Sequence, residues 1–319
     1  MKVYIKEHKH NAGKWIYEGY KAAWESLGYD AEYYSNISEI KEKKFYLMAI
    51  DGDITLENLC ILENAEKVFL YTQPNHFPHP WGLHPNFQCH CPAEVILGLN
   101  KMSNVFYWNF TGRQPKTGIK YDIWKKEINV TPLAYDSISY NLMMKNNKYA
   151  YDVCYVGGRA NNGLDEKYKI MLNFFQKFRN SKRKIGIFIN KNLSHQQENL
   201  ILCSSKVCLN IHDNYQKKLM TCDTNERTFK SLGCNGIMVS DREGFVTKNF
   251  PNLKVSETPD QMLELAEYYL NMPDKELLDL KAKYQNIVLT EHTYINRVSG
   301  LLSCTNKTYE HSDEQTEQG

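Results

Sequence analysis

Short apolar segments alternate with longer amphipathic ones along most of the chain, and this alternation limits the folds that it can adopt. Strands that are joined by helices in this order form parallel βα units. In the first half, the predicted strands are residues 2–8, 30–34, 44–51, 67–73, 104–110 and 129–135. The helix after the first strand has one apolar side and ends at Gly28; that side holds Trp15, Ile16, Tyr20, Ala23, Trp24 and Leu27.

The alternation stops in the polar segment 141–150 and then starts again. The predicted strands of the second half are residues 151–158, 184–190, 206–212 and 235–241, and the predicted helices are 165–178, 259–272 and 274–302. A length of 319 residues suits two domains of about 150 residues each. We therefore predict an α/β protein with two Rossmann-like domains facing a cleft, at residues 1–148 and 149–303. The polar segment 304–319 is predicted to be a disordered tail.

Several functional classes lose their support at this stage. The sequence contains no apolar run long enough for a transmembrane helix, and its N-terminus lacks the apolar core of a signal peptide. Nine scattered cysteines form no disulfide framework, so we predict reduced thiols and a cytoplasmic protein. The phosphate-binding P-loop, the dinucleotide motif G-x-G-x-x-G and the nucleophile elbow G-x-S-x-G are all missing, which disfavours dehydrogenases and hydrolases.

A predicted helix near Asn225 carries basic residues in its first turns. Ligands of parallel sheets bind at the carboxyl ends of the strands, and a helix start favours phosphate there through its free N–H groups and its dipole. Asp223 or Thr224 is the predicted N-cap. Arg227 and Lys230 share a face of the helix, and with Arg159 they are expected to hold a diphosphate. A solvated helix face with ordinary surface charges is the alternative.

The same stretch resembles a known family. "RTFKSLGCNGIMVSD" is similar to the "RTFE-x-x-A-C-G-G" segment of spore-maturation-type glycosyltransferases, and "YDVCYVGG", "VCLNIHD" and "YYLNMPDKE...EHTYINR" add to the likeness over residues 151–300. The resemblance implies the two-domain GT-B fold, a nucleotide-sugar donor such as a UDP-sugar, and a long C-terminal helix that returns to the first domain. The donor site that we predict from the loops and the helix start at this sheet edge comprises Gly158, Arg159, Asn190, His212, Asp213, Arg227, Thr228, Lys230, Asp241, Glu243 and Gly244.

One position departs from the family pattern. Lys230 stands where the family has a glutamate that contacts the donor. Either another acid, Glu226 or Glu243, replaces it, or the protein is a binding domain that has lost turnover.

The acceptor side is expected to lie in the first domain. His8, His10 and Asn11 follow the first strand and are the candidate catalytic residues, because a histidine has a suitable pKa for a general base. "DGD" at Asp51–Asp53 looks like a metal-binding D-x-D motif, but we interpret it as incidental and predict no metal and no cofactor. The His- and Cys-containing segment 75–92 fits no zinc pattern, and we interpret it as an acceptor-binding loop rather than a plain surface loop.

The sequence therefore predicts an enzyme that moves a sugar from a nucleotide-diphosphate donor to an acceptor hydroxyl on a glycan, a protein or a small molecule. An alternative acceptor is hydroxymethylated DNA, as for some phage GT-B enzymes. A basic groove would then be needed, and the residues that could line it, or that simply form a solvated surface, are Lys101, Arg113, Lys116, Lys120, Lys125 and Lys126. A non-catalytic nucleotide-sugar-binding protein is the alternative from another class. No integral membrane association is expected.

Overall fold

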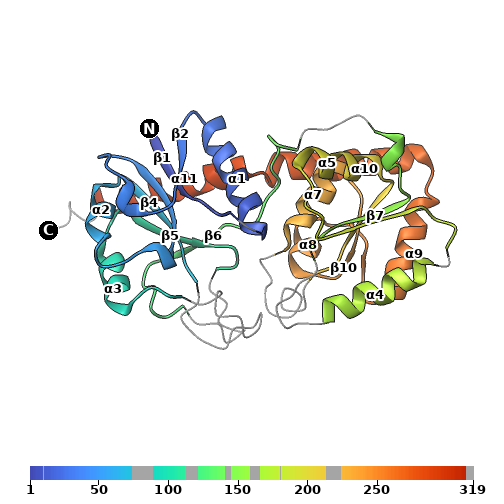
Figure 1. The fold of residues 1–319 in the computed structure, drawn as a ribbon, viewed down its shortest axis with the longest axis horizontal. Coiled ribbons are helices and arrows are strands. Elements are labelled where there is room, and N and C mark those ends of the chain that lie inside the picture. The colour runs from blue at the N-terminus through green and yellow to red at the C-terminus, as the bar shows by residue number, and fades with distance from the viewer. Residues whose placement is uncertain are drawn as a thin grey trace. The chain divides into compact units, whose positions relative to one another are not determined.

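The computed structural model divides the chain into two compact units. It describes residues 1–9, 11–73, 89–112, 121–140, 145–158, 166–179, 181–212 and 224–313. The described residues before Leu133 form the first unit together with those from Tyr294 onward, and the described residues of Leu133–Thr293 form the second (Figure 1). The division after Pro132 falls before the predicted boundary at 148, because the segment from Leu133 packs with the second unit.

The first unit is built on a parallel six-stranded sheet with the order β2-β1-β3-β4-β5-β6. Its strands are β1 (Lys2–Lys6), β2 (Asp30–Tyr34), β3 (Tyr46–Ile50), β4 (Lys67–Tyr71), β5 (Val105–Asn109) and β6 (Ile128–Val130). Its helices are α1 (Asn11–Ser26), α2 (Leu59–Asn64), α3 (Ala93–Lys101) and α11 (Tyr294–Asp313). Most of the predicted apolar side of α1 is buried, since Tyr20, Ala23 and Trp24 have no exposed surface, but Trp15 is half-buried and Leu27, just after the helix, is exposed.

The second unit is built on a parallel five-stranded sheet with the order β11-β10-β9-β7-β8. Its strands are β7 (Val153–Gly157), β8 (Ile185–Ile189), β9 (Val207–Asn210), β10 (Met238–Asp241) and β11 (Val255–Ser256). Its helices are α4 (Glu166–Arg179), α5 (His195–Ser204), α7 (Glu226–Asn235), α8 (Gly244–Asn249), α9 (Pro259–Leu270) and α10 (Asp274–Glu291). The helices pack in two groups, α5 with α7 and α10, and α4 with α9 (Figure 1). The two doubly wound sheets confirm the predicted α/β class.

The C-terminal region differs from the sequence prediction in two ways. The single helix predicted over 274–302 is two helices, because α10 ends at Glu291 and α11 begins at Tyr294. The second of these joins the first unit, as the family resemblance implied: Gly19 of α1 lets the Tyr294 ring approach so closely that a Cβ at Gly19 would lie 2.4 Å from it. Lys67 also donates to Thr305 at 2.6 Å. Helix α11 continues to Asp313, into the segment predicted to be a disordered tail. No helix in the described part of the chain could cross a membrane.

Candidate functional site

The candidate site lies where the strand order of the second sheet reverses. From β7 the chain moves outward to β8, then returns to β9 on the other side of β7 and continues through β10 to β11. The adjacent carboxyl ends of β7 and β9 therefore form the topological switch point of the sheet. Ligands of open α/β sheets bind in the crevice at this point.

The Arg227 side chain bridges the two strands of the switch point. Its Nε donates to the Val156 carbonyl of β7 at 2.7 Å, and its Nη1 donates to the Asn210 side chain of β9 at 3.2 Å and to the Ile211 carbonyl at 3.3 Å. The guanidinium also stacks over the Tyr155 ring, 4.6 Å from its centroid. These contacts hold the guanidinium in one orientation. No partner for its Nη2 is found among the described residues, so this nitrogen can donate to a ligand.

Glycine at position 157 makes room for this arginine. A Cβ atom at Gly157 would lie 2.1 Å from Arg227 Nη2. Any other residue there would displace the guanidinium from the end of β7. The glycine of the "YVGG" segment thus helps to position Arg227. From the sequence, we had linked this segment only to the ligand.

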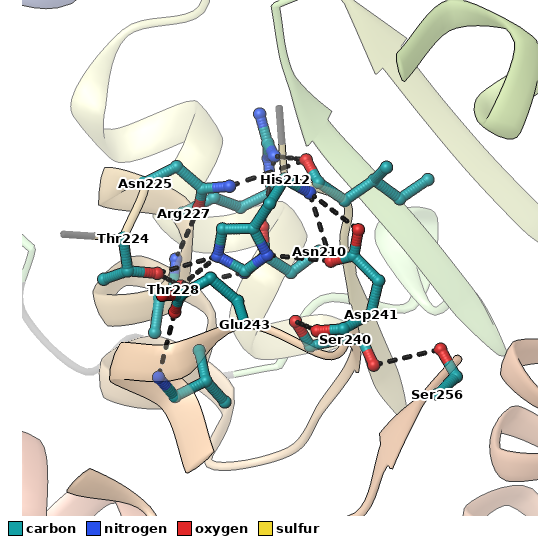
Figure 2. A network of polar contacts seen from close by, with 12 residues as sticks. Asn210, His212, Thr224, Asn225, Arg227, Thr228, Ser240, Asp241, Glu243 and Ser256 are labelled. Carbon is teal, nitrogen blue, oxygen red and sulfur yellow. Dashed lines mark hydrogen bonds and ion pairs between the residues drawn. The ribbon is translucent and has the colours of Figure 1, made fainter. Parts of the chain in front are cut away.

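A buried hydrogen-bond relay runs from Arg227 to Asp241 (Figure 2). Asp241 Oδ1 accepts from His212 Nδ1 at 2.7 Å, which leaves Nε2 as an acceptor for the Thr224 hydroxyl, also at 2.7 Å. Thr224 then accepts from the Thr228 hydroxyl at 2.7 Å, and Thr228 accepts from the Asn210 amide at 2.8 Å. The Asn210 oxygen accepts from Arg227, so every donor and acceptor role along the relay is determined. The relay orients the arginine through buried side chains, of which Asn210, His212, Thr224 and Thr228 have no exposed surface.

The relay makes His212 a neutral imidazole. Burial lowers the pKa of His212 below its usual value, and the neighbouring Asp241 carboxylate opposes this shift only in part. In the unfolded chain the imidazole takes up a proton near pH 6.5, whereas in the folded protein it does so only at lower pH. Stability from this group is therefore present above about pH 6.5 and is lost as the pH falls below it.

We expect this linkage to be measurable in His212→Gln. Between about pH 7.5 and pH 5.5, the free energy of unfolding should fall more in the unmodified protein than in the variant, by at most about 1.4 kcal/mol per pH unit. Urea unfolding at both pH values measures the difference. His195→Gln, at the start of α5 and outside the relay, is the control for replacing a histidine in this unit. An unchanged pH dependence in His212→Gln would show that His212 is not held neutral.

Helix α7 begins at this edge with a different cap from the one predicted. Asn225, not Asp223 or Thr224, is the N-cap, because its side chain accepts from the Thr228 N–H at 3.1 Å. Thr224 instead uses its hydroxyl in the relay. Within the described residues the N–H groups of Glu226 and Arg227 have no partner, so this first turn can bind an anion.

Lys230 lies in an ion cluster of its own, away from the arginine contacts. Its amino group is 3.1 Å from Glu198 of α5 and 3.4 Å from Glu226, and it lies over the Tyr140 ring. Tyr140 donates to Glu198 at 2.5 Å. The two carboxylates raise the pKa of Lys230 against the opposing effect of burial, so it stays charged. Arg227 and Lys230 are three residues apart on one helix. The Lys230 amino group, however, is already neutralised by carboxylates.

The other predicted donor residues occupy different positions at the edge. Asn190 and Gly158 follow β8 and β7, and the Asn190 N–H donates to the Gly157 carbonyl at 3.1 Å. Gly244 begins α8, and the buried Glu243 side chain caps this helix by accepting from Phe245 N and Val246 N at 2.7 and 2.9 Å. Glu243 therefore does not take the place of the family's glutamate, because its carboxylate is used by its own helix. Arg159 and Asp213 lie outside the described residues.

The predicted acceptor residues lie in the first unit. The His8 ring follows β1 and stacks on Tyr17 with centroids 4.2 Å apart. His10 lies outside the described residues, and Asn11 is the first residue of α1. In "DGD", Asp53 is held by Lys6 at 2.8 Å and Tyr34 at 2.9 Å, so it is not a bare metal ligand. No group of three potential metal ligands occurs in the described ranges.

Sequence reasoning missed several residues of the site. Asn210 and Tyr155 were not singled out, and Thr224 was named only as a candidate N-cap, although all three help to hold Arg227. Asn210 had a detectable signal, because an amide inside the otherwise apolar run "VCLN" must find a partner.

Comparison with known proteins agrees with this geometry. Residues 155–303 match the family model described as glycosyl transferase-like. Among solved structures, the DNA-modifying enzyme β-glucosyltransferase has a TM-score of 0.56 at 12% identity, over 96% of this chain and 100% of that chain. The chain has the GT-B glycosyltransferase fold. The family match confirms the predicted class of enzyme, a glycosyltransferase.

Two further structures share this fold. An α-glucosyltransferase in complex with UDP-glucose and DNA containing an abasic site has a TM-score of 0.55 at 7% identity, over 96% of this chain and 98% of that chain. An α,α-trehalose-phosphate synthase (UDP-forming) from Burkholderia xenovorans has a TM-score of 0.53 at 10% identity, over 93% of this chain and 79% of that chain. Comparison with curated protein sequences gave no match.

Proposed function

We propose that this glycosyltransferase takes a UDP-sugar as donor and transfers the sugar to an acceptor hydroxyl. The observation that carries the proposal is the Arg227 guanidinium, which spans the switch point and leaves Nη2 without a protein partner in the described part of the chain. We also propose that it is most similar to the spore-maturation type, on the likeness of "RTFKSLGCNG". Solved neighbours with this fold were studied with UDP-glucose, which supports the choice of nucleotide.

The proposed donor site suits the charge that develops during transfer. As the bond between the sugar C1 and the β-phosphate oxygen breaks, negative charge grows on the leaving diphosphate. Arg227 and the free N–H groups at the start of α7 are held in place before the reaction and can stabilise this charge. The relay through Asn210 and His212 keeps the arginine from reorienting.

Hydroxymethylated DNA is the second candidate acceptor, because two of the solved neighbours are named for DNA modification or DNA binding. The basic groove predicted for it is supported by fewer residues than expected. Lys126 turns inward and donates to the carbonyls of Met102 and Val105, whereas Lys101 and Lys125 are exposed. Arg113, Lys116 and Lys120 lie outside the described residues. A glycan, a protein or a small molecule remains the first proposal.

We further propose a cytoplasmic location. The cysteines of the described ranges are free thiols, the state that a reducing cytoplasm maintains.

A thermal-shift screen of nucleotide sugars tests the proposed donor. UDP and one UDP-sugar should raise the melting temperature, and a free sugar should not. Formation of a glycosylated product, or slow donor hydrolysis, would then separate the enzyme from a non-catalytic binding protein. Stabilisation by no nucleotide diphosphate would overturn the donor assignment.

We expect EDTA to leave the transfer rate within about twofold of its value without chelator. Arg227 and the α7 start supply the positive charge that a divalent cation supplies in metal-dependent transferases. Initial rates with EDTA, and with added Mn²⁺ or Mg²⁺, measure this. A strict metal requirement that Asp53→Ala abolishes would show instead that "DGD" is a metal site.

A further inference from the structure

A row of exposed lysines lies at the amino end of the second sheet, at the opposite end of its strands from Arg227. These lysines precede three neighbouring strands: Lys145 and Lys148 come before β7, Lys182 and Lys184 before β8, and Lys206 before β9. We call this set the lysine row. Neighbouring strands are about 4.8 Å apart, so the three strand starts span about 10 Å, and the length of the strands separates them from the proposed donor site by about 15 Å.

The three segments that carry the lysine row are held side by side. The Lys206 N–H donates to the Tyr151 carbonyl at 2.9 Å, and the Lys184 amino group lies over the Tyr151 ring. The Asn146 N–H donates to the Ser204 hydroxyl at 2.9 Å, which joins the segment before β7 to the segment before β9. The lysine row is therefore one continuous surface within the second unit.

The lysine row carries little opposing charge. Asp152 is the one acidic residue in the segments 145–152, 181–184 and 205–206. It pairs with Lys206 at 3.3 Å, and no carboxylate partner of the other four lysines is found among the described residues. Arg183 does not add to the charge of the row, because Glu267 of α9 neutralises it. A dense, uncompensated positive surface of this kind attracts a polyanion.

Two tyrosine rings position lysines of the row. The Lys148 amino group lies 5.4 Å from the centroid of the Tyr149 ring, and that of Lys184 lies 5.0 Å from the centroid of the Tyr151 ring. The Tyr151 ring also packs on β8, where a Cβ at Gly186 would lie 2.7 Å from it. Because Lys184 and β8 both contact this half-buried ring, it is poorly placed to stack on an unpaired base or to insert into a membrane surface.

We propose that the lysine row binds the phosphate backbone of duplex DNA without reading its sequence. Duplex DNA carries one negative charge per about 1.7 Å of its axis, so several phosphates fit within the width of the row. Contacts from lysine to phosphate fix a protein on the duplex but carry no information about the bases. The row offers cations rather than free aromatic faces, which favours a duplex over a single strand. It would hold the enzyme on DNA whichever hydroxyl accepts the sugar.

Fluorescence anisotropy with a labelled duplex, over a series of salt concentrations, tests this binding. The dissociation constant should be about 10⁻⁴–10⁻⁶ M at physiological salt and equal for two unrelated sequences. The triple variant Lys148→Ala, Lys184→Ala and Lys206→Ala should weaken binding by at least about tenfold at about 50 mM salt. It should also reduce the slope of log K against log salt concentration by about 2–3, because each lost phosphate contact removes about one released counterion.

A second triple variant is the matched control. Lys41→Ala, Lys43→Ala and Lys169→Ala remove the same charge from exposed lysines outside the row. This control should keep the affinity for the duplex within about threefold, because exposed charges farther away than a Debye length are largely screened. Both triple variants should bind UDP as the unmodified protein does, because Arg227 and the start of α7 are unchanged.

Three outcomes would overturn the proposal. An equal loss of DNA binding in the two triple variants would show that net charge, not the row, attracts the duplex. Tighter binding to a single strand than to the duplex would contradict the choice of partner. Binding to phosphatidylserine vesicles that only the row variant loses, without binding to DNA, would assign the row to a membrane surface. A protein that binds the duplex through the row but binds no nucleotide sugar would contradict the proposed function and leave this inference intact.

Discussion

Arg227→Ala should weaken UDP binding by about 10- to 150-fold, which corresponds to about 1.5–3 kcal/mol for one charge-assisted contact. The arginine is held by the Val156 carbonyl and by Asn210, and its Nη2, which has no partner in the described ranges, is the nitrogen expected to meet the diphosphate. Removing it takes away both the charge and the bridge between β7 and β9. Calorimetric titration with UDP measures the affinity.

Two further variants show whether the geometry or the charge of Arg227 is responsible for UDP binding. Arg227→Lys keeps the charge, but its single ammonium group cannot donate to β7 and β9 as the planar guanidinium does. This variant should therefore recover only part of the affinity for UDP. Arg242→Ala removes an exposed arginine that pairs with Glu257 near the same edge, and it should leave UDP binding unchanged. Equal affinity for UDP in Arg227→Ala and the unmodified protein would remove Arg227 from the donor site.

Lys230→Glu should lower the free energy of unfolding by about 3–5 kcal/mol, the range measured when one partner of a buried ion pair is removed. The change leaves Glu198 and Glu226 without their cation and adds a third carboxylate beside them. From the sequence we expected this substitution to act on donor binding, because a lysine three residues after Arg227 was assigned to the diphosphate. Because Lys230 lies in the ion cluster, we now expect Lys230→Glu to act on the stability of the fold instead.

A double-mutant cycle with Lys230→Met and Glu198→Gln isolates the pair. Lys230→Met alone should be destabilising, because it leaves buried carboxylates unpaired. The double variant should recover part of the loss, because it removes one of those carboxylates as well. Urea unfolding gives the free energies, and UDP titration of the folded variants shows whether binding also changes. If Lys230→Glu were as stable as the unmodified protein and bound UDP more weakly, Lys230 would contact phosphate after all.

The sequence by itself predicted most strands of both sheets and the helices α1, α4 and α9, and it placed the proposed donor site at the start of α7. Strands such as β3 and β9 are short apolar runs, and α1 has one apolar side, so a local pattern suffices to predict them. A helix beginning near Asn225 was also predicted correctly, because a helix start and its first residues are neighbours in sequence, whereas the role of Arg227 in donor binding stays a prediction. The fold class followed from the order of these elements.

Only the tertiary structure decided which partners the charged residues have. Lys230 finds Glu198 on α5, thirty-two residues earlier, and no local pattern encodes that approach. Asp51 and Asp53 look alike in "DGD", yet only one of them is paired with Lys6, because packing buries the other beside Gln73. The packing of α11 in the first unit likewise depends on the fit of Tyr294 against Gly19. Local periodicity is a property of neighbouring residues, whereas burial, ion pairing and the resulting pKa values depend on residues that only the fold brings together.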